Sequence, residues 1–200
     1  MTIALVLLDL QTGILLSDRI KFEDAGMPRR ALAAAETLRG AARAVGAPVV
    51  HVGVVRPRVR GAYDSLRTTT ALKLGRAPRD VLALAAGTDD IAFAVVPAAD
   101  EEVVHKVGVS AFQGTRLDAL LRNAGVADVV VAGAFTHMVV ESTVRQGFDL
   151  GYRMTVVADG CCAPMVATHN AALTVSIPNF AVVVSSVEAV ALFQRGSRAP

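Results

Sequence analysis

The sequence predicts an α/β fold: a doubly wound, six-stranded parallel sheet flanked by helices in a three-layer, Rossmann-like arrangement. Short apolar runs, such as residues 3–8, alternate along the chain with helical patterns. This order favours right-handed crossovers between parallel strands. The runs are continuously apolar, which is typical of strands buried on both faces of a sheet. A length of 200 residues, without a repeat, linker or low-complexity segment, indicates a single domain over residues 1–200.

Six apolar segments are the predicted strands. They cover residues 3–8, 48–54, 102–107, 129–132, 153–157 and 180–184. Each has the length of a buried strand and is far too short to span a bilayer.

Helix signals lie between these strands, over residues 28–45, 80–86, 116–123, 139–150, 166–175 and from 187 onward. Pro28 stands in the first turn of the first long helix and Gly46 follows its end. Thr115 is placed to cap the helix at 116–123, and Gly125 lies just beyond that helix. Residues 56–75 are polar and rich in arginine, so we expect a long functional loop there.

Composition excludes several classes of protein. Hydrophobic residues make up 53% and charged residues 19%, which excludes a disordered chain. Mean hydropathy is +0.48, but Asp9 interrupts the first apolar run and no basic segment precedes it, so we expect neither a secretory signal nor a membrane span. The net charge is +2, and the small cluster Arg56, Arg58, Arg60 and Arg67 suits either a solvated loop or a small anionic ligand, rather than nucleic acid.

Two adjacent cysteines, Cys161 and Cys162, are the only ones in the chain. Neighbouring cysteines rarely bridge each other because the geometry is strained. Reduced thiols in a cytoplasmic protein are therefore expected.

Ligands of open α/β sheets bind beyond the carboxyl ends of the strands. The residues at these ends include Asp9, Gln11, Arg56, Lys106, residues 135–139 and residues 159–162. Asp9 alone is consistent with a turn cap, and Lys106 alone with a surface ion pair. Together they predict an acid and a base on one rim of the sheet, where each tunes the other.

Four motifs carry a resemblance to a known family. They are LLDLQTG at 7–13, HKVGVSAF at 105–112, GAFTHMVVEST at 133–143, and GYRMTVVADG at 151–160 with His169 nine residues on. In this order they resemble the motifs of the isochorismatase-like hydrolases, within the cysteine hydrolase superfamily. The match spans nearly the whole chain and implies a six-stranded parallel sheet between helices.

The resemblance implies roles for individual residues. Asp9 corresponds to the family's proton acceptor or donor and Lys106 to its partner. The N–H groups of Phe135 and Val139 correspond to an oxyanion hole. Val139 stands where most members carry the nucleophilic cysteine, and valine is no nucleophile. Cys161 and Cys162 do not replace it in the motif, so we read them as structural.

No cofactor or metal is expected. The zinc site of the nicotinamidases in this family needs an aspartate and two histidines near the second strand, and only His51 occurs there. Because His51 lies inside an apolar run, we expect it to be a hydrogen-bonded histidine of the core.

The leading hypothesis is a hydrolase of a small anionic molecule that uses Asp9 and Lys106 without a covalent intermediate. True isochorismatases lack the cysteine, and their aspartate acts as a general acid on an enol ether. The expected substrate contacts are Gln11, Phe22, Arg56, Phe112 and His137. The alternatives are a catalytically silent member that binds a small ligand or serves as a structural subunit and, third, a cysteine-dependent amidase. A homo-oligomer, dimer or tetramer, is expected, with the apolar segment 182–193 as a candidate interface.

Overall fold

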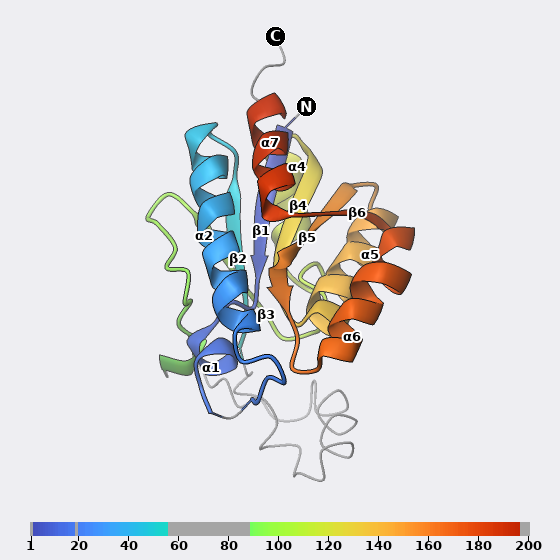
Figure 1. Cartoon of the computed structure of the whole chain (residues 1–200). Coiled ribbons are helices and arrows are strands. Elements are labelled where there is room, and N and C mark those ends of the chain that lie inside the picture. The colour runs from blue at the N-terminus through green and yellow to red at the C-terminus, as the bar shows by residue number, and fades with distance from the viewer. Residues whose placement is uncertain (1, 19, 56–88, 197–200) are drawn as a thin grey trace.

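Six parallel strands form one sheet in the order β3-β2-β1-β4-β5-β6 (Figure 1). The computed structural model describes residues 2–18, 20–55 and 89–196. The strands are β1 (Thr2–Leu8), β2 (Val49–Val54), β3 (Glu102–Lys106), β4 (Val126–Ala134), β5 (Arg153–Cys162) and β6 (Ala181–Val184). The chain winds outward twice from β1, so the predicted fold class and all six strands are confirmed.

The central strand β1 supplies both hydrophobic cores. Ala4, Val6 and Leu8 face one side of the sheet, and Leu5 and Leu7 face the other; all five are buried. Successive side chains of a strand point to opposite faces, so an uninterrupted apolar run is what a doubly covered strand requires.

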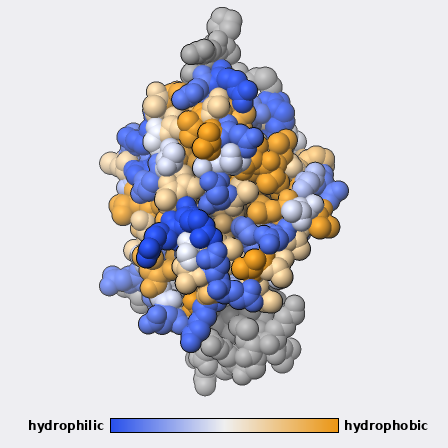
Figure 2. Space-filling model, viewed as in Figure 1, coloured by the Kyte–Doolittle hydropathy of each residue, from blue (hydrophilic) through white to orange (hydrophobic). Residues whose placement is uncertain are grey.

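Helices cover the two faces of the sheet. On one face, toward the viewer in Figure 1, lie α2 (Met27–Ala44) and α7 (Ser186–Gly196). On the other face α4 (Leu117–Asn123), α5 (Glu141–Asp149) and the segment that begins with α6 (Val166–Ala171) pack against the sheet. Figure 2 shows hydrophilic side chains interspersed with hydrophobic ones over the α2 and α7 side, as expected of amphipathic helices. No helix within the described ranges is long and apolar enough to cross a membrane.

Helix signals in the sequence were mostly correct. Pro28 lies in the first turn of α2, and the Thr115 hydroxyl accepts a hydrogen bond of 3.2 Å from the N–H of Leu117 at the start of α4. The short helix α1 (Thr12–Leu15) was not predicted, because four residues are too few to show a helical period. The predicted loop at 56–75 and the predicted helix at 80–86 lie outside the described residues.

Strands β4 and β5 are longer than predicted. The predicted strand at 153–157 continues to Cys162, and its pairing with β4 shifts register between Val131 and Gly133. Asp159 lies in this irregular stretch and accepts hydrogen bonds from the N–H and hydroxyl of Ser186, at 2.7 and 2.6 Å. Residues 159–162, expected just after the fifth strand, therefore belong to β5 itself, and Asp159 caps α7.

The proposed interface segment is only partly exposed. Val182 and Val187 are 64% and 78% exposed, whereas Ala189 and Phe193 are fully buried in the core beneath α7. The homo-oligomer stays a prediction.

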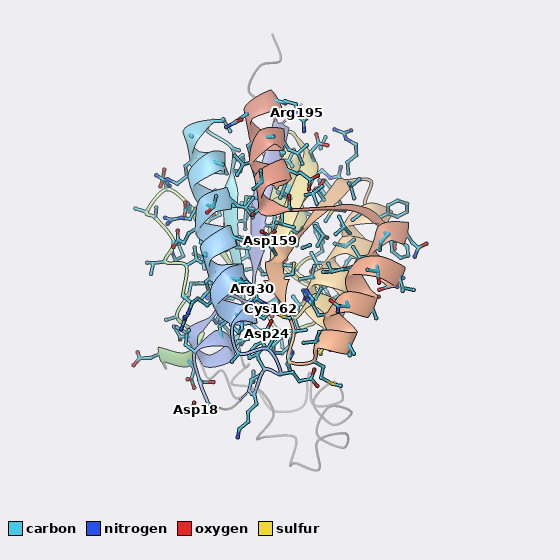
Figure 3. All side chains as sticks on the ribbon, in the orientation of Figure 1. Asp18, Asp24, Arg30, Asp159, Cys162 and Arg195 are labelled. Atoms are coloured by element: carbon cyan, nitrogen blue, oxygen red, sulfur yellow. The ribbon has the colours of Figure 1, made fainter. Side chains whose placement is uncertain are left out.

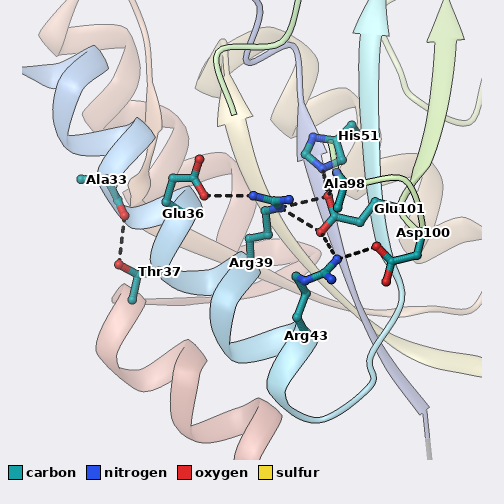
Figure 4. Close-up of polar contacts among 9 residues, drawn as sticks. All are labelled: Ala33, Glu36, Thr37, Arg39, Arg43, His51, Ala98, Asp100 and Glu101. Carbon is teal, nitrogen blue, oxygen red and sulfur yellow. Dashed lines mark hydrogen bonds and ion pairs between the residues drawn. The ribbon is translucent and has the colours of Figure 1, made fainter. Parts of the chain in front are cut away.

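A buried carboxylate joins α2 to the β2–β3 side of the sheet (Figure 4). Glu101, just before β3, accepts hydrogen bonds from Arg39 at 2.8 and 2.9 Å and from Arg43 at 3.0 Å, both on α2. His51 of β2 lies 2.9 Å from the same carboxylate. Burial alone would raise the pKa of Glu101, but these hydrogen bonds, with Arg39 first, lower it from 4.5 to about 2.

We predict that Glu101 makes the protein sensitive to acid. A carboxylate whose pKa is depressed in the folded state stabilises the fold above pH 4.5, and this contribution is lost as the pH falls toward about 2. Replacing Glu101 by Gln should lower the free energy of unfolding at neutral pH by about 2 kcal/mol or more. The free energy of unfolding of this variant should also decrease less steeply between pH 4.5 and a pH of about 2 than that of the wild type. Urea unfolding at a series of pH values measures both effects.

The neighbouring Glu102→Gln variant is the matched control. Glu102 forms an exposed ion pair with Arg116, so its replacement should change the free energy of unfolding by no more than about 0.5 kcal/mol. Equal effects of the two variants would contradict the prediction.

Candidate active site

A buried ion pair lies at the carboxyl ends of the strands. Asp9 directly follows β1 and Lys106 ends β3, with β2 between them. The Lys106 ammonium reaches past the end of β2 and donates a hydrogen bond of 2.8 Å to Asp9 Oδ2 and one of 3.2 Å to the carbonyl of Gly108. The side chain of Asp9 is only 4% exposed and that of Lys106 only 1%. The structure therefore brings together the acid and the base that the sequence placed on one rim.

One oxygen of the Asp9 carboxyl has no hydrogen-bond partner among the described residues. Asp9 Oδ1 is buried and accepts no hydrogen bond from the described residues. Burial raises the pKa of Asp9 and outweighs the lowering effect of Lys106. The carboxyl thus holds a proton more readily than an exposed aspartic acid does.

Backbone geometry fixes where Asp9 lies. Its φ is +52°, a left-handed conformation that aspartate tolerates better than most residues, and its N–H donates to the Val52 carbonyl at 2.7 Å. On the other side of β1, a Cβ on Gly133 would lie 2.1 Å from the carbonyl oxygen of Leu8. Only glycine allows β4 to approach β1 this closely beside Asp9.

The turn after β4 contains the expected oxyanion-hole residues. The Ala134–Phe135 peptide is cis, and the wide helical turn η3 (Thr136–Val140) follows and leads into α5. This turn begins three residues earlier than the predicted helix at 139–150. The side chain of Val139 is buried in the core on the α5 face of the sheet. The roles of the Phe135 and Val139 N–H groups stay predictions.

A hydrogen bond that the sequence did not suggest holds this turn. Thr136 Oγ1 and His169 Nδ1 of α6 lie 2.8 Å apart, and both side chains are buried. His169 had been noted only as part of a motif, and nothing in a single sequence pairs two residues so far apart. The neighbouring His137 is half-buried, and burial lowers its pKa, so its imidazole is neutral near pH 7.

The side chain of Gln11 is buried and hydrogen-bonded to backbone groups. Its amide NH₂ donates to the carbonyls of Val54 and Ile91 at 3.1 and 3.0 Å, and its Oε1 accepts from the N–H of Val54 at 2.8 Å. Both N–H donors are already used and the residue is fully buried. A role in positioning the end of β2 fits this arrangement better than the expected substrate contact.

The two phenylalanines expected to contact the substrate, Phe22 and Phe112, lie in different surroundings. Phe112 is buried in the core and stacks on Tyr152, with ring centroids 5.7 Å apart; the substrate contact expected of it stays a prediction. Phe22 is half-buried, and its ring lies against that of Phe135, with ring centroids 6.2 Å apart. Arg56 lies outside the described residues, as does the rest of the arginine-rich segment.

Sequence and structure comparisons agree on the relatives of this chain. The family model described as "Isochorismatase domain" matches residues 3–188. The chain belongs to the isochorismatase family. The ureidoacrylate amidohydrolase RutB of Pseudomonas syringae pv. syringae is 31% identical over 140 residues, which cover 66% of this chain and 54% of that protein. The chain therefore matches only about half the length of this curated relative.

Solved structures of the family have the same fold. An isochorismatase family protein from Burkholderia thailandensis is 27% identical, with a TM-score of 0.77 and 96% of each chain covered. The N-carbamoylsarcosine amidase from Thermoplasma acidophilum has a TM-score of 0.72 at 24% identity, covering 93% of this chain and 97% of that one. The second similarity shows the fold alone.

His51 is the core histidine that the sequence predicted. It is fully buried, and its Nε2 lies 2.9 Å from Glu101, which confirms that interpretation. Within the ranges that the structure describes, no three histidine, cysteine or acidic side chains come close enough to hold a metal ion. That this chain needs neither a metal nor another cofactor stays a prediction.

The two cysteines are buried on opposite faces of the sheet. Cys161 packs into the core on the α5 face and Cys162 into the core beneath α2 and α7; they are 1% and 0% exposed. Burial raises the pKa of Cys161 to about 12 and also raises the pKa of Cys162. Neither side chain is a thiolate near neutral pH, which is the form that nucleophilic attack requires.

We predict that both thiols of the native protein resist modification. Ellman's reagent should release less than one equivalent of thionitrobenzoate from the folded chain and two equivalents after unfolding in guanidinium, because burial blocks access and thiolate formation. Absorbance at 412 nm measures both values. Fast reaction of one thiol in the folded protein, with protection by a substrate, would show that this cysteine lies in an active site.

Proposed function

We propose that this isochorismatase-family protein hydrolyses a small anionic molecule by acid–base catalysis, with Asp9 as the general acid and no covalent cysteine intermediate. The observation that carries the proposal is the unpartnered, buried Oδ1 of an aspartic acid whose other oxygen is held by Lys106. A general acid needs a proton at neutral pH and a free direction in which to donate it. Asp9 has both.

The proposed steps conserve protons. Protonated Asp9 donates from Oδ1 to the substrate, at the terminal alkene carbon of a vinyl ether or the leaving nitrogen of an amide, while Lys106 compensates the negative charge that forms on the carboxylate. A water molecule then adds to the activated carbon and loses a proton, which returns to Asp9. The net change is the addition of one water and the cleavage of one bond. For an amide substrate, the N–H groups of Phe135 and Val139 are the proposed donors to the oxyanion that forms when water adds to the carbonyl carbon.

Val139 rules out an acyl-enzyme at the position that we assign to the family nucleophile. Its buried side chain contributes to the core, and the nearby cysteines are inaccessible and protonated. These observations support direct attack by water. Because the relative RutB is named an amidohydrolase, small amides belong among the substrates to test beside vinyl ethers.

We predict that Asp9→Asn reduces turnover by at least about 10²–10⁴-fold, the usual contribution of a general acid. Asparagine is nearly isosteric and can still accept from Lys106, but it cannot donate the catalytic proton. The measurement is kcat/KM over a panel of vinyl ethers and small amides, with circular dichroism to verify the fold. The matched control is Asp149→Asn, which neutralises an exposed aspartate at the end of α5.

Two outcomes decide against this proposal. Unchanged turnover in Asp9→Asn would eliminate acid catalysis by Asp9. Absence of turnover by the wild type on every substrate, together with ligand binding, would instead indicate a catalytically silent member of the family.

We predict that kcat/KM falls as the pH rises through the pKa of Asp9. A general acid works in its protonated form, and burial places this pKa above the ordinary value of 3.8, so the falling limb lies above pH 3.8. A pH profile of the wild type measures the limb, and the residual activity of Asp9→Asn should lack it. A profile that rises with pH in this range would assign Asp9 the role of a base.

A further inference from the structure

A cavity separate from the Asp9–Lys106 pair opens between α1 and the start of α2. Its volume is about 570 Å³, within the range typical of small-molecule sites. Eleven residues line it: Leu15, Leu16, Ser17, Asp18, Ile20, Lys21, Phe22, Ala25, Pro28, Arg29 and Leu32. Figure 3 shows Asp18 beside α1, near the carboxyl ends of the strands, and Arg195 at the opposite end of the molecule.

Two cations of this lining have no side-chain partner among the described residues. The side chains of Lys21 and Arg29 make no ion pair or hydrogen bond to that part of the chain, whereas the side chain of the next residue, Arg30, pairs with Asp24. Among the described residues of the lining, Asp18 is the one carboxylate beside two cationic side chains, so positive charge exceeds negative charge there. Unpaired lysine and arginine side chains around a concavity favour an anion.

The rest of the lining is apolar. Leu16 is 64% exposed although it lines the cavity, and Ile20, Phe22 and Leu32 are only partly buried. Covering such side chains with an apolar ligand releases water and stabilises a complex. A simple inorganic anion would leave these side chains exposed.

We propose that this cavity binds a small amphiphilic carboxylate, with the carboxylate between Lys21 and Arg29 and the apolar body against Leu16, Ile20 and Leu32. The site adjoins the candidate active site, because Phe22 lines the cavity and its ring contacts Phe135 of the β4 turn. The inference does not depend on the proposed hydrolysis, since binding is measured without turnover.

Octanoate is the probe, and isothermal titration calorimetry measures its binding. The wild type should bind octanoate at least tenfold more tightly than either octanol, which lacks the charge, or acetate, which lacks the apolar body. The double variant Lys21→Met/Arg29→Met keeps the apolar stems and removes both charges, so it should bind octanoate at least tenfold more weakly. The control Arg195→Met changes an exposed arginine on α7 and should bind like the wild type.

An Asp9→Asn protein separates the two sites. It should bind octanoate with the affinity of the wild type, because Asp9 does not line the cavity. Loss of binding in Asp9→Asn would place octanoate at the ion pair and overturn the proposal. Absence of octanoate binding by the wild type, or unchanged binding by the double variant, would overturn it as well.

Discussion

The ion pair between Asp9 and Lys106 is the interaction around which the rest of the site is arranged. Moving two charges out of water costs several kcal/mol for each ion, and only close, well-oriented contacts offset that cost. The sheet supplies this precision: β1 and β3 end on the same rim, and β2 separates them by the distance that one lysine side chain spans. Gln11 reinforces the arrangement, because its amide binds the end of β2 between the two charged residues. The pair is therefore a product of the strand order as much as of its own chemistry.

Valine at position 139, which the motif resemblance aligns with the family's cysteine, bears on the chemistry proposed for this chain. A nucleophilic cysteine needs a thiolate, and the thiols of this chain lie in the two cores with their protons held by burial. An aspartic acid with a raised pKa and a neighbouring ammonium can still move protons. Chemistry that relies on a proton and a water molecule is thus compatible with the residues present.

Local patterns and long-range contacts differ in how far the sequence predicts them. The run at 3–8 and the closeness of Asp9 to Lys106 followed from general rules, because buried parallel strands are continuously apolar and their carboxyl ends share one rim. The extension of β5 and the capping role of Asp159 depend on an irregular register with β4 and on a serine 27 positions away. The burial of Phe112 and the saturation of the Gln11 amide likewise arise from packing partners that no pattern within a single segment identifies.

The separation of Asp9 and Lys106 along the chain, 97 positions, has a consequence for how the protein folds. Contacts between distant segments form only after the entropy of closing long loops has been overcome, and parallel strands require such closures. Strand β1 must pair with β2, and β2 with β3, before Asp9 and Lys106 lie on one rim. The two charges therefore come together, and leave water, only where these long-range strand pairings have formed.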